Sequence, residues 1–235
     1  MRRHFYSPVH GAGDRDRRVL LTAGPDALTR RGLDFAPTYG ATNLLMPRIA
    51  GGETGDVAIL TDAGIEELTR RGIIVDGSRR DLARSAIGIA VKAGAARPNI
   101  RSVDAFKQAM LVARSVAFSR SGASGLHFAE LIERLGIAPD VMRKARVFDG
   151  VVGELAAKGE VELAVQQVSE LKLVDGIDIV GALPDELQKL TMFSAGVFAR
   201  SPRPAAAGLL VTALASPEAM NAMRRQGLEP IGRVG

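Results

Sequence analysis

Small and hydroxylated residues gather in one turn, SRSGAS, between a predicted strand and a predicted helix near the middle of the chain. The strand is expected at residues 115–118, and the helix runs to Gly136 with apolar side chains at helical spacing. Ser124 is the expected N-cap, so the first amides of the helix would face a turn that contains Ser121. Such amides favour an anion. The stretch predicts an oxyanion-binding corner; the alternative is a capped connection without a ligand.

The same residue types follow three strands that are expected in the first half of the chain. These strands and the residues after them are 19–23 with Gly24, 33–39 with Thr42 and Asn43, and 56–60 with Thr61. Parallel α/β sheets bring the carboxyl ends of their strands together, and ligands bind at that edge. The threonines and the asparagine could equally serve as helix caps.

Strands and helices alternate along most of the chain, which predicts an α/β fold of two lobes. Further strands are expected at 85–91, 115–118, 145–148, 162–167, 177–181 and 191–199. The segments 85–91 and 191–199 are predicted to cross between the lobes as a hinge, with a ligand in the cleft. The expected division is 19–91 plus 192–235 for lobe one, 92–191 for lobe two, and 1–18 as an N-terminal arm.

Composition excludes several classes of function. The net charge of +5 is concentrated near the start of the chain, and only 4% of residues are aromatic, so nucleic-acid binding is not expected. The chain has no cysteine and three histidines without metal-ligand spacing, so neither a metal site nor a cofactor is predicted. No apolar run is long enough to span a membrane. We expect a monomer.

The first residues, MRRHFYSPVHGAGDRDRR, carry the charges of a signal peptide without an apolar stretch behind them. As written, the chain is expected to be cytoplasmic. The alternative is that an exported precursor begins elsewhere.

Six motifs in one order resemble the molybdate-binding-like branch of the type II periplasmic solute-binding proteins. They are GATN with GGETGDVAIL, DLARSAIGIAV, SGASGLHFAELIERLG, ELAVQQVSEL, LPDELQKLTMFSAGVFA and SPEAMNAMRRQGLEP. The resemblance covers about residues 33–230. It implies two α/β lobes joined by two crossing strands, which close on a small anion for delivery to a membrane importer in the periplasm.

The resemblance also implies ligand-binding positions that use hydroxyls and backbone amides. Together with Asn43, the matching residues are Gly24, Thr42, Thr61, Ser121, Ser124, Val152 and Gln167. One departure is the short segment PDALTRRG, where the family has a long helix between its first two strands.

Two charged or titratable residues point to a different member of the same family. Arg84 precedes the crossing segment and could hold a carboxylate bidentately, although it could also pair with Asp81 or Glu53. His127 lies in the first turn of its helix and could act as a general acid or base, although a packed histidine is the alternative. Arg84 and the segments FSAGVFA, VQQVSE and SGASGLHFA resemble the aconitate isomerases, a side branch that isomerises an unsaturated tricarboxylate. An isomerase is therefore the alternative to a binding protein.

Overall fold

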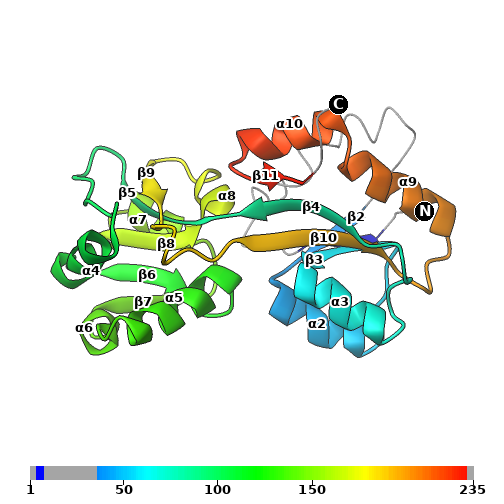
Figure 1. Ribbon diagram of the computed structural model, residues 1–235, viewed down its shortest axis with the longest axis horizontal. Helices are drawn as coiled ribbons and strands as arrows, with labels where there is room; N and C mark the ends of the chain where they lie inside the picture. Colours follow the sequence, from blue (N-terminus) through cyan, green and yellow to red (C-terminus); the bar gives the residue numbers. More distant parts are fainter. Residues whose placement is uncertain (1–3, 8–35, 232–235) are drawn as a thin grey trace. The chain divides into compact units, whose positions relative to one another are not determined.

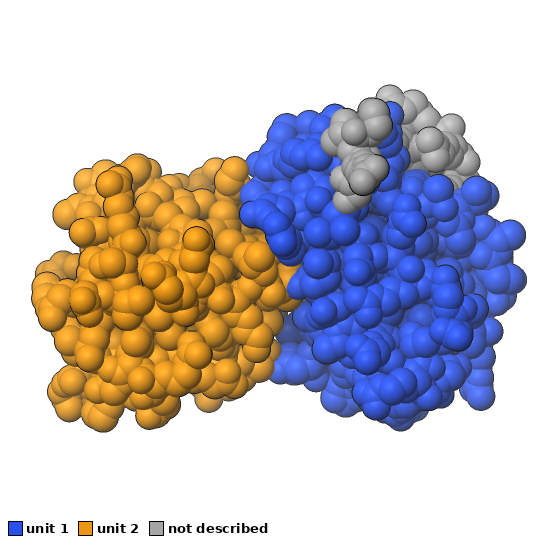
Figure 2. Space-filling model, in the orientation of Figure 1, with its two compact units in different colours: residues 1–84, 192–235 blue, residues 85–191 orange. Residues whose placement is uncertain are grey.

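The computed structural model describes residues 4–7 and 36–231. The expected strand at 19–23 and Gly24 lie outside these ranges. The chain divides into two compact units, one formed by residues 1–84 with 192–235 and the other by residues 85–191 (Figure 2). It passes between them after Arg84 and again after Thr191.

The first unit contains a six-stranded sheet with the order β11-β4-β10-β3-β1-β2 (Figure 1). Its strands are β1 His4–Ser7, β2 Ala36–Tyr39, β3 Val57–Thr61, β4 Arg80–Ser85, β10 Thr191–Val197 and β11 Glu229–Pro230. Its helices are α2 Thr42–Ala50, α3 Asp62–Arg70, α9 Pro204–Leu214 and α10 Pro217–Arg225. Strand β1 is parallel to β2 and β3, whereas β10 is antiparallel to β3.

Local sequence explains why β3 and α3 form where they do. Residues 57–60 are all apolar and fully buried, as expected for an inner strand. Ile65 and Leu68 are the buried face of α3, and Thr61 caps this helix by accepting a hydrogen bond from the Gly64 amide at 3.3 Å. Both helices α2 and α3 pack through one apolar cluster that includes Leu45.

The expected N-terminal arm was wrong for His4–Ser7, which forms the inner strand β1. The prediction rested on the arginines that flank this stretch, which itself contains none. Two aromatic residues at its centre, Phe5 and Tyr6, have high strand propensity, and both pair with β2 and β3.

The second unit contains a five-stranded sheet with the order β7-β6-β8-β5-β9. Its strands are β5 Ile87–Lys92, β6 Val116–Ser119, β7 Ala145–Phe148, β8 Leu163–Gln167 and β9 Ile177–Ala182. Its helices are α4 Val103–Val112, α5 Ala123–Arg134, α6 Ala138–Met142, α7 Gly153–Ala157 and α8 Val168–Leu171. Strand β6 is parallel to both β7 and β8, so these three strands end at the same edge. Separate apolar clusters involve α4, α5 and α6 on one side and α7 and α8 on the other.

A strand that was not expected from the sequence precedes the expected hinge. Residues 80–85, RDLARS, form the strand β4 in the first unit's sheet, and β5 belongs to the sheet of the second unit. The three charged residues of this segment argue against a strand in the sequence. Of the residues of β4, only Leu82, Ala83 and Ser85 are buried, so the charged side chains remain accessible to solvent.

Among the described helices, none combines the length and apolar character needed to cross a bilayer.

Candidate functional site

Two threonines predicted to bind a ligand lie together in the first unit. Thr42 begins α2, and its hydroxyl oxygen accepts a hydrogen bond from the Thr61 amide at 3.2 Å. The helices α2 and α3 follow the parallel-aligned strands β2 and β3, so their first turns start from the same edge of the sheet. The predicted convergence of the two turns is therefore present within this unit.

The start of α2 has no side-chain cap, so its first amides are candidates for binding an anion. Its N-cap, Ala41, is extended and makes no side-chain capping bond. Backbone amides in the first turn of a helix have no partner within that helix, and they carry the positive end of its dipole. Asn43, the second residue of α2, is exposed. Its side chain is not the cap that the sequence suggested as an alternative.

The turn that was predicted to be an oxyanion-binding corner of the second unit is built differently from the expectation. Gly122, not Ser124, is the N-cap of α5, and Ser124 lies inside the helix at 2% exposure. The turn is stabilised by the Ser119 hydroxyl, which accepts a hydrogen bond from the Gly122 amide at 2.9 Å. Glycine takes the cap position because no side chain there is needed once Ser119 closes the turn. Ser121 is half-buried in this turn.

Gly125 sets how closely α5 approaches the end of β6. A Cβ atom at this position would lie 1.7 Å from the Ser119 carbonyl oxygen. Only glycine permits this contact, which keeps the first turn of α5 against the strand end. The corner is therefore a rigid backbone feature.

The segment after β7 and the end of β8 complete the same edge. The Val152 side chain is apolar and fully buried, so only backbone groups of this residue could bind an anion. The Gln166 side chain is also fully buried, and its Oε1 accepts a hydrogen bond from the Gly153 amide at 3.4 Å. Within the described residues its Nε2 has no hydrogen-bond partner. A buried donor without an acceptor costs about 1–3 kcal/mol, so the Gln166 Nε2 is a candidate donor to a ligand, one that the sequence analysis did not identify.

Gln167 has a different environment from Gln166. Its side chain is 3% exposed, and its carboxamide is engaged by residues of the segments that connect the two units. The sequence predicted Gln167 as a ligand contact.

Arg84 pairs with an acidic residue that the sequence did not suggest. Its Nε lies 2.6 Å from Oε2 of Glu229 on β11, and both side chains are about half exposed. The two expected partners are engaged elsewhere, since Asp81 binds Arg79 and Glu53 binds Arg48. An ion pair this exposed contributes about 0–1 kcal/mol, so the guanidinium can exchange Glu229 for a ligand carboxylate at little cost.

The neighbouring carboxylate, Asp81, is committed to structure. The hydrogen bond from Arg79 is the main cause that lowers the pKa of Asp81, and the Ser194 hydroxyl adds to it at 2.6 Å. Asp81 therefore stays ionised near neutral pH.

His127 is buried in the second unit. Its exposed fraction is 8%, and its Nε2 lies 2.8 Å from the carbonyl oxygen of Leu187. Since a carbonyl only accepts, Nε2 carries the proton. The contact joins α5 to the segment that precedes β10.

We expect His127→Leu to destabilise the protein by about 1–3 kcal/mol, because it leaves the Leu187 carbonyl buried without a donor. His127→Gln keeps an amide donor and should cost less than half as much. Urea unfolding of both variants measures the difference. Equal stability of the two variants would contradict the hydrogen bond as the reason for this histidine.

A metal centre has no support in the described part of the chain, where no group of three or more histidine, aspartate or glutamate side chains could hold an ion. Each unit by itself carries donors suited to an anion: helix-start amides, hydroxyls and Arg84 in the first, and helix-start amides, hydroxyls and carboxamides in the second.

Comparison with a family model decides the relationship. Residues 24–229 match the model for bacterial extracellular solute-binding proteins. This chain belongs to that family. Its two α/β units have the type II periplasmic-binding-protein fold, as the resemblance implied.

Two kinds of relative stand out for this solute-binding protein. A curated Pseudomonas protein named aconitate isomerase is 41% identical over 199 residues, which cover 83% of this chain and 76% of the relative. Among solved structures, the periplasmic molybdate-binding protein of Azotobacter vinelandii has a TM-score of 0.77 at 16% identity and covers 97% of this chain and 98% of its own. The Mycobacterium tuberculosis sulfate-binding protein SubI has a TM-score of 0.71 at 15% identity, over 97% of this chain and 85% of its own. At these identities the structural neighbours establish the fold alone.

Proposed function

We propose that this protein binds a small organic polyanion of the aconitate class and interconverts its isomers. The observation that carries the proposal is the identity to aconitate isomerase over most of the chain. A relative this similar supports a shared ligand class, whereas the molybdate- and sulfate-binding structures share too little sequence to do so.

The donors of both units suit a ligand with several carboxylates. The first unit offers the open start of α2 and the exposed Arg84, and the second offers the start of α5 and the Gln166 amide. Planar carboxylates pair well with a guanidinium, and helix-start amides hold a second carboxylate without a fixed charge.

Isomerisation of an unsaturated tricarboxylate requires a proton shuttle. A base removes a proton from the carbon next to the double bond, the electron pair spreads toward a carboxylate, and a proton returns at the other end of the three-carbon unit. No atom is gained or lost. The contact of His127 with Leu187 favours a structural role for this histidine, so the base is to be sought among other groups that reach the ligand.

A second candidate function is delivery of a small anion to a membrane importer, with the protein acting in the periplasm. It is favoured by the donor set itself, because hydroxyls and helix amides bind an oxyanion without any change of protonation. In this case turnover is absent and molybdate or sulfate competes with carboxylates.

Calorimetric titration distinguishes the two ligand classes. We expect trans-aconitate to bind at one molecule per chain, with molybdate and sulfate at least about tenfold weaker. Tight binding of molybdate with no response to aconitate would contradict the isomerase proposal and support the second candidate.

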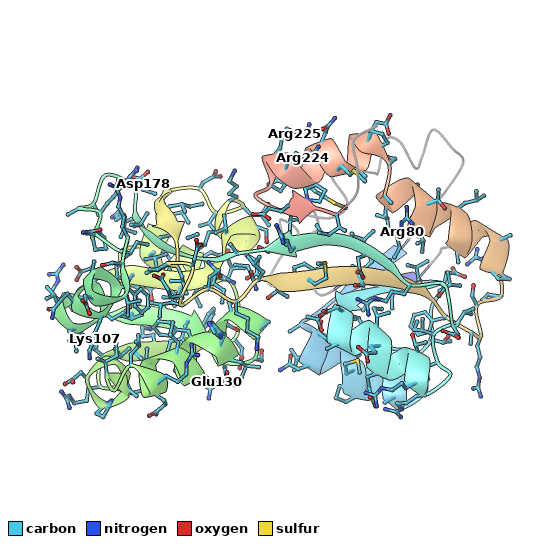
Figure 3. The ribbon with its side chains drawn as sticks, in the orientation of Figure 1. Arg80, Lys107, Glu130, Asp178, Arg224 and Arg225 are labelled. Carbon is cyan, nitrogen blue, oxygen red and sulfur yellow. The ribbon has the colours of Figure 1, made fainter. Side chains whose placement is uncertain are left out.

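Arg84→Ala tests the charged contact. We expect it to weaken trans-aconitate binding by about tenfold or more, because a charge-assisted pair is lost. Arg80→Ala is the matched control: Arg80 is an exposed arginine on the same strand (Figure 3), and its removal should leave the affinity unchanged. Glu229→Gln should strengthen binding, since it removes the competing carboxylate. Unchanged affinity in Arg84→Ala would remove Arg84 from the site.

A further inference from the structure

Two glutamines of the second unit join the chain segment that enters the unit to the segment that leaves it. The entering segment is Ser85–Ile87, and the leaving segment is Gln188–Thr191. These segments are about a hundred residues apart in the sequence. Every contact described below lies within the second unit.

Gln167 makes the first connection. Its carboxamide nitrogen lies 3.2 Å from the Ser85 carbonyl oxygen and 3.1 Å from that of Ala86, and its oxygen accepts a hydrogen bond from the Thr191 hydroxyl at 2.7 Å. This orientation satisfies both ends of the group, whereas the reverse would set an oxygen against two carbonyl oxygens. The adjacent amide of Val168 also donates to the Ala86 carbonyl, at 2.8 Å.

Gln188 makes the second connection, one residue further into the unit. Its Oε1 accepts from the Ile87 amide at 2.8 Å, and its Nε2 donates to the Ile87 carbonyl at 2.9 Å. A side-chain amide that binds both backbone groups of one residue acts like a neighbouring strand for that residue.

A buried serine pair lies beside the first connection. The hydroxyls of Ser85 and Ser169 are 3.0 Å apart, and both residues are at most 3% exposed. Ser169 belongs to α8, which begins directly after Gln167. Hydrogen bonds in such a protected position are stronger than surface ones, so the entering segment is fixed on more than one side.

We infer that Gln167 and Gln188 form a clamp that fixes both connecting segments to the second unit, and that Gln167 affects ligand binding as a positioning residue. The identity of the ligand rests on the proposed function, whereas the clamp itself does not. The clamp fixes the chain from Ser85 onward and up to Thr191. Any backbone rotation that accompanies ligand binding therefore has to occur before Ser85 or after Thr191, unless the clamp opens. Gln167 ends β8 and directly follows Gln166, so the clamp lies at the strand end that carries the candidate donors of this unit.

The test compares the affinity for trans-aconitate of three variants with that of the wild-type protein, all as the full chain. The variants are Gln167→Leu, Thr191→Val and Gln188→Leu. Thr191→Val keeps the shape of the side chain and removes the hydroxyl that binds Gln167. Gln108→Leu is the control, since Gln108 is an exposed glutamine on α4. Each clamp variant should weaken trans-aconitate binding by about fivefold, and the Gln167→Leu/Thr191→Val double variant should be no weaker than the more affected single one.

Hydrogen exchange without ligand provides a second readout. Peptides that cover residues 85–88 and 187–192 should exchange at least about fivefold faster in the clamp variants than in the control. If wild-type protein binds no aconitate, the proposed function fails, and the exchange data still decide the clamp. Weaker binding in Gln167→Leu with unchanged affinity and exchange in Thr191→Val and Gln188→Leu would show a direct ligand contact and overturn the inference.

Discussion

Gly125→Ala is expected to lower the stability of the protein by about 3 kcal/mol or more. The new Cβ would lie 1.7 Å from the Ser119 carbonyl oxygen and 2.6 Å from the carbonyl carbon. These are backbone atoms of the turn after β6, so no side chain can move aside. Relief requires the start of α5 to shift away from the strand.

This shift should also remove ligand binding, because the first amides of α5 would no longer point into the turn closed by Ser119 and Gly122. Calorimetry should show a melting temperature lower by about 6–12 °C, and titration with trans-aconitate should show no saturable binding. Two controls separate the causes. Gly208→Ala adds a methyl group to a helix at a position with open space around it, and it should raise the stability of the protein slightly. Glu130→Gln changes an exposed side chain of α5 (Figure 3) and should leave both stability and ligand binding unchanged. Wild-type stability in Gly125→Ala would contradict the described packing.

Phe128→Ala is expected to cost about 3–5 kcal/mol. This fully buried ring joins α5 to two other aromatic residues of the same core. Its centroid lies 6.5 Å from that of Phe106 in an edge arrangement and 5.0 Å from that of Phe118 on β6. Removal leaves a cavity and loses both ring contacts.

Denaturant unfolding measures this loss, with Leu126→Ala as the matched control on the same helix. Leu126 is 48% exposed, so its truncation should change the free energy of unfolding by less than about 1 kcal/mol. The two variants therefore test whether α5 is held by its buried face. A cost below about 1.5 kcal/mol for Phe128→Ala would show that the core repacks around the missing ring.

Local patterns were sufficient to predict many elements of the fold. The strand β7 has the predicted bounds, Ala145–Phe148, and the last helix begins with a local signal, Ser216 as its cap and Pro217 at its first position. Both features depend on neighbouring residues alone. Where charged residues interrupt the local pattern, as in β4, or flank a short strand, as in β1, the strand depends on partners far along the chain.

The candidate site was predictable in its backbone and less so in its side chains. The turn before α5 follows from small residues at the end of a strand, although Gly122 rather than Ser124 caps the helix. The partner of Arg84 is 145 residues away, and the partners of Gln167 come from both connecting segments. Such pairings depend on the tertiary structure, which spacing in one sequence does not reveal.

Proton NMR of cis-aconitate incubated with the protein shows whether the two isomers interconvert. We expect the vinyl signal of the trans isomer to appear at a rate proportional to the protein concentration, and the same equilibrium mixture to be reached from either isomer. The rate should fall at least about tenfold in Arg84→Ala and remain unchanged in Arg80→Ala. If trans-aconitate binds but neither isomer is converted, the protein is a carrier of carboxylates and the isomerase account is wrong.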